Sequence, residues 1–229
     1  MKRYAIGDIH GNCKGLIECL KAVDFSYADD KLIVLGDVVD GYPETKKCVN
    51  VLLTIKNLVM VLGNHDAWAL EWMKTGYAER IWTSQGGQAT INSYIEDGEE
   101  VPERHIRFFE KALPYYEEDD CLFVHGGIKM NTRAEENRPY DMTWDRTLAE
   151  TSFHKSIDTK KLTPYKEVFI GHTTTYCFNT DKPVHGYEVW NLDTGAGWGG
   201  RLTIMNLDTH EYWQSELAKK LYPNHHGRR

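Results

Sequence analysis

Three short motifs that begin with glycine each follow an apolar run in the first third of the chain, and they constrain the fold more than any other feature. They read GDIHG at 7–11, GDVVD at 36–40 and GNHD at 63–66. Their carboxylates, imidazoles and amide are side chains that bind metal ions. Glycine lets the backbone turn sharply at the end of each run, so that these side chains can converge. The pattern predicts a metal site at the edge of a sheet.

The apolar runs are short and end in glycine, which is typical of buried strands in an α/β sheet. They cover residues 3–6, 31–35 and 58–62. Between them, residues 12–23 and 43–55 repeat apolar side chains at intervals of three and four, and Pro43 can begin a helix. The first 65 residues therefore predict a β-α-β-α-β order. Functional groups in open α/β sheets gather beyond the carboxyl ends of the strands, where all three motifs fall.

Two later segments repeat the arrangement of an apolar run followed by a histidine. Residues 121–124 lead into HGG at 125–127, and residues 168–170 lead into GHT at 171–173. Periodicity predicts helices over 67–73, 85–95 and 103–113, and strands over 187–192, 202–207 and 209–213. We expect these last strands to form a second sheet packed on the first. Trp68 and Trp72, four apart, are expected to pack their helix.

Length and composition favour one enzyme domain. The 229 residues contain no linker or low-complexity segment, so residues 1–222 are expected to form a single domain and Pro223 to Arg229 a frayed polar tail. No stretch approaches the roughly 18 to 20 apolar residues that span a bilayer. The apolar segment after the basic start is too short for a signal peptide. We therefore expect a cytoplasmic protein without a membrane segment.

Cysteine content and charge exclude two further classes. The five cysteines form no CxxC pair and their number is odd, which argues against a disulfide framework. The formal net charge is −7, whereas a nucleic-acid-binding surface would be basic. Nucleic acid is therefore not an expected partner.

The ordered set of motifs GDIHG, GDVVD, GNHD, HGG and GHT resembles the calcineurin-like metallophosphoesterase superfamily. Within it, the set resembles the phosphoprotein phosphatase branch, which includes the bacterial and lambda-phage serine/threonine protein phosphatases. The resemblance spans residues 7–172, and the segment Asp193-Thr-Gly-Ala also resembles the bacterial branch. It implies an α/β fold with two packed mixed β-sheets flanked by helices, a four-layer α/β/β/α sandwich. It also implies two divalent or trivalent metal ions, Mn, Fe or Zn, with Mn expected to support activity in vitro.

The resemblance assigns the metal ligands by position. They would be Asp8 and His10 on the first metal, Asp37 between the two metals, and Asn64, His125 and His172 on the second. The residue types suit these positions. A carboxylate can span two cations, neutral imidazoles can bind on the outer sides, and an amide oxygen adds a ligand without more negative charge.

The resemblance also assigns the catalytic pair. His65 matches the general acid that protonates the departing oxygen, and Asp40 matches the carboxylate that holds this imidazole charged and oriented. Arg146, in a Trp-x-Arg element, and Asn64 match residues that contact the substrate phosphate.

One position departs from the branch. The second motif usually continues as Asp-Arg-Gly, and that arginine holds the substrate phosphate, whereas Gly41 follows Asp40 here. Loss of a bidentate cation should weaken phosphate binding. A displaced arginine such as Arg138 or Arg201 could compensate.

Together these residues predict a metal-dependent phosphoesterase that hydrolyses phosphomonoesters by direct attack of a hydroxide bridging the metals. Its substrate would be phosphoserine or phosphothreonine on a protein, or a small phosphoester. The alternative is a symmetrical dinucleoside-polyphosphate hydrolase, which shares the metal motifs and cuts an anhydride. A second alternative is a non-catalytic binding scaffold.

Overall fold

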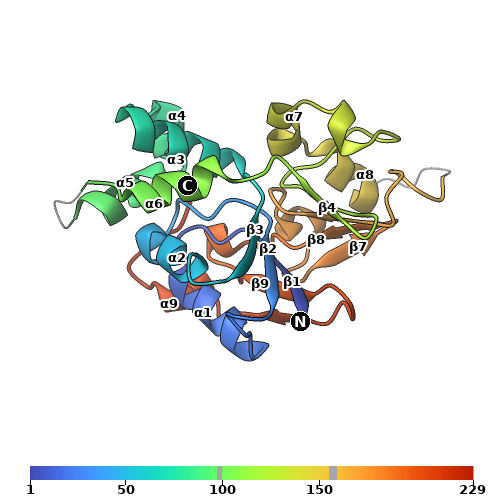
Figure 1. Ribbon diagram of the computed structural model, residues 1–229, viewed down its shortest axis with the longest axis horizontal. Helices are drawn as coiled ribbons and strands as arrows, with labels where there is room; N and C mark the ends of the chain where they lie inside the picture. Colours follow the sequence, from blue (N-terminus) through green and yellow to red (C-terminus); the bar gives the residue numbers. More distant parts are fainter. Residues whose placement is uncertain (97–99, 155–158, 229) are drawn as a thin grey trace.

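The computed structural model describes residues 1–96, 100–154 and 159–228. The described residues form two five-stranded mixed sheets (Figure 1). The first has the order β10-β9-β1-β2-β3 and the second β4-β5-β6-β8-β7. The strands are β1 (Arg3–Ile6), β2 (Lys31–Val34), β3 (Asn57–Met60), β4 (Tyr116–Glu118), β5 (Cys121–Phe123), β6 (Glu167–Ile170), β7 (Val184–Gly186), β8 (Val189–Asn191), β9 (Thr203–Asn206) and β10 (Tyr212–Gln214).

Helices cover the outer faces of both sheets, with α1 to α6 beside the first sheet and α7 and α8 beside the second (Figure 1). The α-helices are α1 (Cys13–Ala22), α2 (Thr45–Leu52), α3 (Asn64–Thr75), α4 (Arg80–Trp82), α5 (Gln88–Ile95), α6 (Glu103–Glu110), α7 (Pro139–Trp144), α8 (Thr147–His154) and α9 (Ala218–Leu221). The predicted β-α-β-α-β start is confirmed as β1-α1-β2-α2-β3. None of the helices in the described part of the chain is long and apolar enough to cross a membrane.

The composition of the second sheet differs from the sequence prediction. We expected the strands over 202–207 and 209–213 to belong to it, but β9 and β10 extend the first sheet. β9 pairs antiparallel with β1, with Ala5 opposite Met205, while β2 pairs parallel on the other side of β1. Without β9 the backbone groups of β1 would lack partners on one side, and buried N–H and C=O groups need them. The second sheet is instead built from β5, β6 and β8, with the short strands β4 and β7 at its edges.

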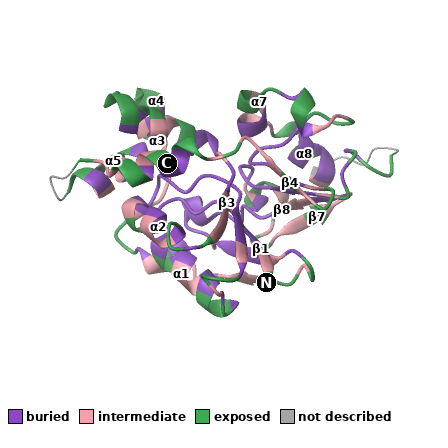
Figure 2. Ribbon diagram, in the orientation of Figure 1, coloured by how far each residue is buried: buried purple, intermediate pink, exposed green. Residues whose placement is uncertain are grey.

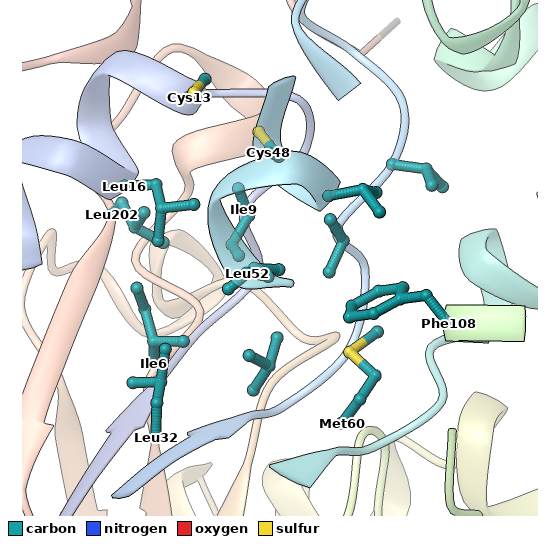
Figure 3. Close-up of a cluster of buried hydrophobic side chains, with 14 of the residues drawn as sticks. Ile6, Ile9, Cys13, Leu16, Leu32, Cys48, Leu52, Met60, Phe108 and Leu202 are labelled. Atoms are coloured by element: carbon teal, nitrogen blue, oxygen red, sulfur yellow. The ribbon is translucent and has the colours of Figure 1, made fainter. Parts of the chain in front are cut away.

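Three hydrophobic clusters separate the layers. Ala5, Ile33, Phe123 and Phe169 meet between the two sheets, where the rings of Phe123 and Phe169 stack 5.0 Å apart. A larger cluster fills the space between the first sheet and α1, α2, α3 and α6 (Figure 3). A third lies between the second sheet and α7 and α8. These layers confirm the expected α/β/β/α sandwich.

The cluster shown in Figure 3 fixes the helices that follow the first motifs. Leu16 of α1, Leu52 of α2 and Phe108 of α6 belong to one buried cluster with Ile6 of β1, and Phe108 lies beside Met60 of β3. Burial of each such side chain contributes roughly 1.5–3 kcal/mol. Because α1 and α2 are held this way, the loops that precede them are held against the carboxyl ends of β1 and β2. Figure 2 shows that the buried residues concentrate in the strands and in the loops between the two groups of helices.

Candidate metal centre and active site

Five loops at the carboxyl ends of β1, β2, β3, β5 and β6 bring the predicted ligands together. Asp8, His10 and Asp37 form one buried group whose ligand atoms all lie within 4.8 Å of one another. Asp37, His125 and His172 form a second such group. Asp37 is common to both. Two adjoining triads that share one carboxylate match the expected binuclear site.

The backbone of these loops lies in the left-handed region at several site residues. The φ angles are +51° at His10, +49° at Asp37, +75° at Asp40 and +64° at His172. None of these residues is glycine, and such a conformation costs a non-glycine residue on the order of 1–3 kcal/mol. The surrounding fold therefore holds these side chains in orientations that an isolated chain would rarely adopt.

Two motif glycines are required for space rather than for a turn. A Cβ atom on Gly63 would lie 2.1 Å from Oδ1 of Asp37, and one on Gly171 would lie 2.1 Å from Oδ1 of Asp8. Gly63 has φ of −88°, which any residue adopts. We predicted sharp turning as the reason for these glycines, but here the carboxylates pack directly onto the glycine backbone. Any side chain at either position would displace a metal-ligand carboxylate.

Backbone carbonyls orient two of the imidazoles. Nδ1 of His10 lies 2.9 Å from the oxygen of Val39, and Nδ1 of His125 lies 2.7 Å from the oxygen of Leu35. A carbonyl oxygen only accepts, so each Nδ1 carries a hydrogen, and each Nε2 is the nitrogen that faces the interior of the cluster. Oδ1 of Asn64 lies 3.1 Å from Nε2 of His125, which places the predicted amide ligand beside the second triad.

The charge balance of the cluster fits bound cations. Burial and the nearby carboxylate of Asp193 raise the pKa of Asp8 well above its usual range. Burial opposes charge on His125, but the carboxylates of Asp37 and Asp8 outweigh it and raise the pKa of that imidazole to about 10. Oδ2 of Asp37 and Nε2 of His172 are buried without a hydrogen-bond partner among the described residues. The cluster thus presents unsatisfied carboxylate and imidazole ligand atoms to its interior, as a metal site requires.

The predicted catalytic pair is in direct contact. Nδ1 of His65 lies 2.5 Å from Oδ2 of Asp40. The same oxygen accepts a hydrogen bond from Nε1 of Trp82 at 2.7 Å, and Oδ1 accepts one from the hydroxyl of Thr90 at 2.7 Å. Nε2 of His65 is buried and has no protein partner in the described part of the chain. The imidazole is therefore held by one nitrogen and free to act with the other.

Sequence reasoning missed the supports of this pair and of Asp37. Asp66 accepts hydrogen bonds from the backbone N–H groups of Asp37, Val38 and Gly63 at 2.7, 2.9 and 3.0 Å. Burial and the charge of Asp37 raise its pKa to about 7. Gly63 is the N-cap residue of α3 and Asp66 is the third residue of that helix. An acidic side chain at this third position often caps the start of a helix, so the spacing could have indicated that Asp66 accepts backbone hydrogen bonds here. Trp82 and Thr90 come from separate helical segments, and no local signal points to them.

Of the three candidate arginines, Arg146 lies at the site, whereas Arg138 and Arg201 bond elsewhere. Nη1 of Arg146 donates to the backbone oxygen of His172 at 3.2 Å and to Oγ1 of Thr173 at 3.3 Å, so this exposed residue lies at the rim of the site. Arg138 is paired with the carboxylate of Asp141 at 2.8 Å. Arg201 donates to the backbone oxygen of Ser215 at 2.8 Å.

An arginine that the sequence did not suggest lies at the metal centre. Residues 223–228, expected as a frayed tail, return to the body of the molecule. The backbone N–H of Arg228 donates to the oxygen of Gly197 at 2.8 Å, and its Nη1 lies 3.1 Å from Nε2 of His10.

Aromatic rings line the site beside the catalytic pair. The ring centroid of Trp68 lies 5.2 Å from that of His65 and 5.1 Å from that of Trp144. Trp144 lies 6.0 Å from His172 and 6.2 Å from the exposed Tyr140. We call Trp68, Trp144 and Tyr140 the aromatic row. Trp72 is buried in the core as expected. Trp68 is half-buried, and it packs against the same cluster while its ring also contacts His65.

The fold and the paired triads define a metal-dependent hydrolase of phosphoester or phosphoanhydride bonds. Residues 1–200 match the sequence profile of the calcineurin-like phosphoesterase family, and the chain belongs to that family.

Curated relatives cover nearly the whole chain. A protein of Neisseria gonorrhoeae named symmetrical bis(5'-nucleosyl)-tetraphosphatase is 24% identical over 279 residues, which cover 95% of this chain and 96% of the relative. A protein of the same name from Pseudomonas fluorescens is 26% identical and covers 96% of each chain.

A solved structure described as a candidate diadenosine tetraphosphatase superposes with a TM-score of 0.68 at 18% identity, over 93% of this chain and 92% of that one. A protein serine/threonine phosphatase of Saccharomyces cerevisiae gives 0.57 at 12% identity, over 90% and 73%. Both structures share the fold. The sequence relatives thus carry a different name from the protein phosphatase branch that the motifs resemble.

Proposed function

We propose that this chain hydrolyses a phosphoanhydride bond in a dinucleoside polyphosphate, with symmetrical cleavage of the tetraphosphate as its first candidate reaction. The observation that carries the proposal is the aromatic row, which lies directly beside the metal centre. Stacking of a base on an aromatic side chain contributes roughly 1–3 kcal/mol. Phosphoserine and aliphatic phosphomonoesters have no ring to stack on such a surface. The names of the curated relatives support the same substrate class.

The site residues divide the work between metal binding and proton transfer. The two triads and Asn64 would hold a pair of metal ions, which supply an acidified water and neutralise charge on the phosphates when bound. His65 donates its Nδ1 hydrogen to Asp40, so Nε2 is the atom that gives a proton to the departing phosphate oxygen. Trp82 donates to the same oxygen of Asp40 and Thr90 donates to the other, and together they hold the carboxylate in place.

Arg146 and the aromatic row, at the edge of the metal centre, would orient the substrate. Arg146 lies on the backbone of His172, where its guanidinium can contact a phosphate that extends from the metal centre. The ring of Trp144 lies between His172 and Tyr140, so a nucleoside attached to that phosphate would meet the aromatic row. In this pose Trp68 contacts the base on the side of His65.

The test compares substrates and aromatic variants. Diadenosine tetraphosphate is incubated with the protein and Mn²⁺, Zn²⁺ or Fe²⁺, and the products are separated by chromatography. We expect ADP as the sole nucleotide product, and we expect Trp68→Leu and Trp144→Leu to raise KM by about tenfold through loss of base stacking. Tyr77→Leu, an exposed aromatic just beyond α3, is the matched control and should behave as the parent protein.

Two results would contradict the proposal. Equal amounts of AMP and ATP would show asymmetrical cleavage. Rapid hydrolysis of an aryl phosphate or a phosphopeptide, with diadenosine tetraphosphate untouched under every metal, would favour the phosphomonoesterase alternative. In that case the two tryptophan variants would leave KM for the monoester unchanged.

A further inference from the structure

The segment that contains Arg228 is held against the active-site loops by its backbone. The N–H of His225 donates to the oxygen of Tyr222 at 3.0 Å, and the N–H of Arg228 donates to the oxygen of Gly197 at 2.8 Å. Gly227 has φ of +71°, and a Cβ there would lie 2.4 Å from the oxygen of Gly197. Only glycine fits this approach. The position of Arg228 is therefore set by specific contacts rather than by its side chain alone.

Two glycines make room for the stem of Arg228. A Cβ on Gly41 would lie 3.3 Å from Cγ of Arg228, and a Cβ on Gly86 would lie 3.3 Å from the same atom. The N–H of Gly41 donates to the oxygen of Gly86 at 3.2 Å, which joins the two loops. The Arg228 side chain thus fills the space that a side chain at position 41, directly after Asp40, would otherwise enter.

The guanidinium of Arg228 lies at the metal centre without a carboxylate partner. Its Nη1 is 3.1 Å from Nε2 of His10, and its carbon lies 5.1 Å from the centre of the Trp198 ring. Its Nε is buried and has no acceptor among the described residues, nor does any carboxylate oxygen in that part of the chain lie within 4.0 Å of its nitrogens. A guanidinium carries five N–H donors in a planar fork, and those of Arg228 are largely unused.

The contact between Arg228 and His10 indicates where the guanidinium N–H groups would lie when a metal ion is bound. Nε2 of His10 is the nitrogen that faces the first triad, because Nδ1 is bonded to Val39. A nitrogen that binds a metal ion has no lone pair left for an arginine donor. The guanidinium must then turn from His10 while its stem stays between Gly41 and Gly86. It remains beside the first triad and next to Gly41, the residue that follows Asp40. A substrate phosphate would have to lie at this same centre.

We propose that Arg228 is a substrate-binding residue, which holds a phosphate of the substrate at the metal centre from a segment remote in sequence from the metal motifs. The inference rests on the proposed function. Planar bidentate contact with phosphate oxygens is the recognition for which guanidinium is suited. With Arg146 on the His172 side, two arginines would then grip the phosphate chain from opposite sides of the metal centre.

The first test measures binding of inorganic phosphate to the Mn²⁺-loaded protein by calorimetry, which requires no turnover. Arg228→Ala should weaken phosphate binding by about tenfold or more through loss of charge-assisted hydrogen bonds, with the Mn content unchanged. Arg228→Lys should restore only part of the affinity, because lysine keeps the charge but not the fork. Arg138→Ala, which removes an exposed arginine paired with Asp141, is the matched control and should bind phosphate as the parent does.

The second test places an arginine at position 41, directly after Asp40, in a protein that lacks Arg228. Arg228→Ala removes the Cγ atom that lies 3.3 Å from a Cβ at position 41, and the backbone nitrogen of residue 228 remains at the same distance. In this background Gly41→Arg should recover phosphate binding. Gly41→Ala in the same background imposes the same φ of +82° on a side chain without supplying a guanidinium, and it should not recover binding.

Two outcomes would overturn the inference. Unchanged phosphate affinity in Arg228→Ala would show that the guanidinium takes no part in binding. Tighter Mn²⁺ binding with undiminished phosphate affinity would show that Arg228 instead competes with the metal for His10. Failure of the proposed function is seen separately, because it concerns cleavage of diadenosine tetraphosphate, whereas phosphate affinity and metal content need no nucleotide.

Discussion

Nδ1 of His65 lies 2.5 Å from Oδ2 of Asp40, and neither side chain is exposed to solvent. This contact occupies Nδ1 and leaves Nε2 of His65 as the nitrogen without a partner in the described part of the chain. Asp40→Asn removes the negative charge and replaces one acceptor oxygen with an NH₂ donor, while it keeps the size of the side chain. We expect kcat for diadenosine tetraphosphate to fall by about 10²-fold or more, in the range of general acid–base contributions. Metal content should stay that of the parent, since Asp40 belongs to neither triad.

Asp24→Asn, an acid-to-amide change at a distant exposed position, is the control for this measurement. Steady-state kinetics on the two variants, with metal analysis of each preparation, shows whether kcat falls while the metal content stays unchanged. A fall in kcat that tracks a fall in metal content would assign Asp40 to the metal centre instead.

A substitution at Thr90 tests whether the position of Asp40 beside His65 affects kcat. Its hydroxyl accepts from the N–H of Asp40 at 2.8 Å and donates to Oδ1 of Asp40 at 2.7 Å. Thr90→Val keeps the shape but leaves both groups without a partner, which costs about 1–3 kcal/mol of folding free energy per unsatisfied group. We expect reduced thermal stability and a lower kcat in Thr90→Val.

Thr90→Ser keeps the hydroxyl and serves as the matched variant. It should recover kcat and most of the stability. Equal kcat in the serine and valine variants would show that the hydroxyl does not position Asp40.

The contact between Gly171 and Asp8 predicts a selective loss of metal. A Cβ on Gly171 would lie 2.1 Å from Oδ1 of Asp8, so Gly171→Ala must displace this carboxylate from the first triad. We expect the variant to retain less Mn²⁺ than the parent after gel filtration. Added Mn²⁺ should raise the melting temperature of the parent more than that of the variant, since a ligand that binds only the folded state stabilises it.

Melting curves in EDTA separate this effect from general damage. If the variant and the parent melt alike in EDTA but differ in Mn²⁺, the substitution acts through the metal site. An undiminished Mn²⁺ response in Gly171→Ala would contradict the displacement of Asp8.

The sequence predicted the parts of the fold whose signals are local. The runs before Gly7, Gly36 and Gly63 are strands, of which β1 and β2 are largely buried and β3 is partly buried, and the helices between them carry a clear apolar face. The placement of β9 beside β1 depends on pairing between residues about 200 positions apart, which no local pattern encodes. The edge strands β4 and β7 span three residues each and are too short for a periodic signal.

The same distinction applies to the site. The six predicted ligands lie in motifs that end strands, and the structure brings them together in and beside the two triads. Thr90 and Arg228 act through tertiary contacts from segments without a motif, so their sequence neighbourhoods gave no signal. Gly41 was the one local sign of Arg228, because its lack of a side chain leaves the space that the arginine fills.

A buried histidine away from the metal centre predicts a pH effect on stability. Nδ1 of His105 lies 3.0 Å from the hydroxyl of Tyr94, and Nε2 lies 3.1 Å from Oδ1 of Asn50. Burial, with the positive charges of Arg104 and Lys46, lowers the pKa of His105 to about 4. The ordinary value in an unfolded chain is about 6.5. Between these two values the unfolded chain binds a proton that the folded protein excludes.

Stability should therefore fall as the pH is lowered through this window. The contribution of His105 to unfolding free energy is fully present above about pH 6.5 and decreases toward pH 4, by on the order of 2 kcal/mol at pH 5. His105→Gln removes the titrating group. Urea unfolding in EDTA at pH 7 and pH 5 should show a smaller loss of stability in this variant than in the parent, while His226→Gln, at an exposed position, should match the parent. An identical loss in His105→Gln and the parent would mean that other groups account for the acid sensitivity.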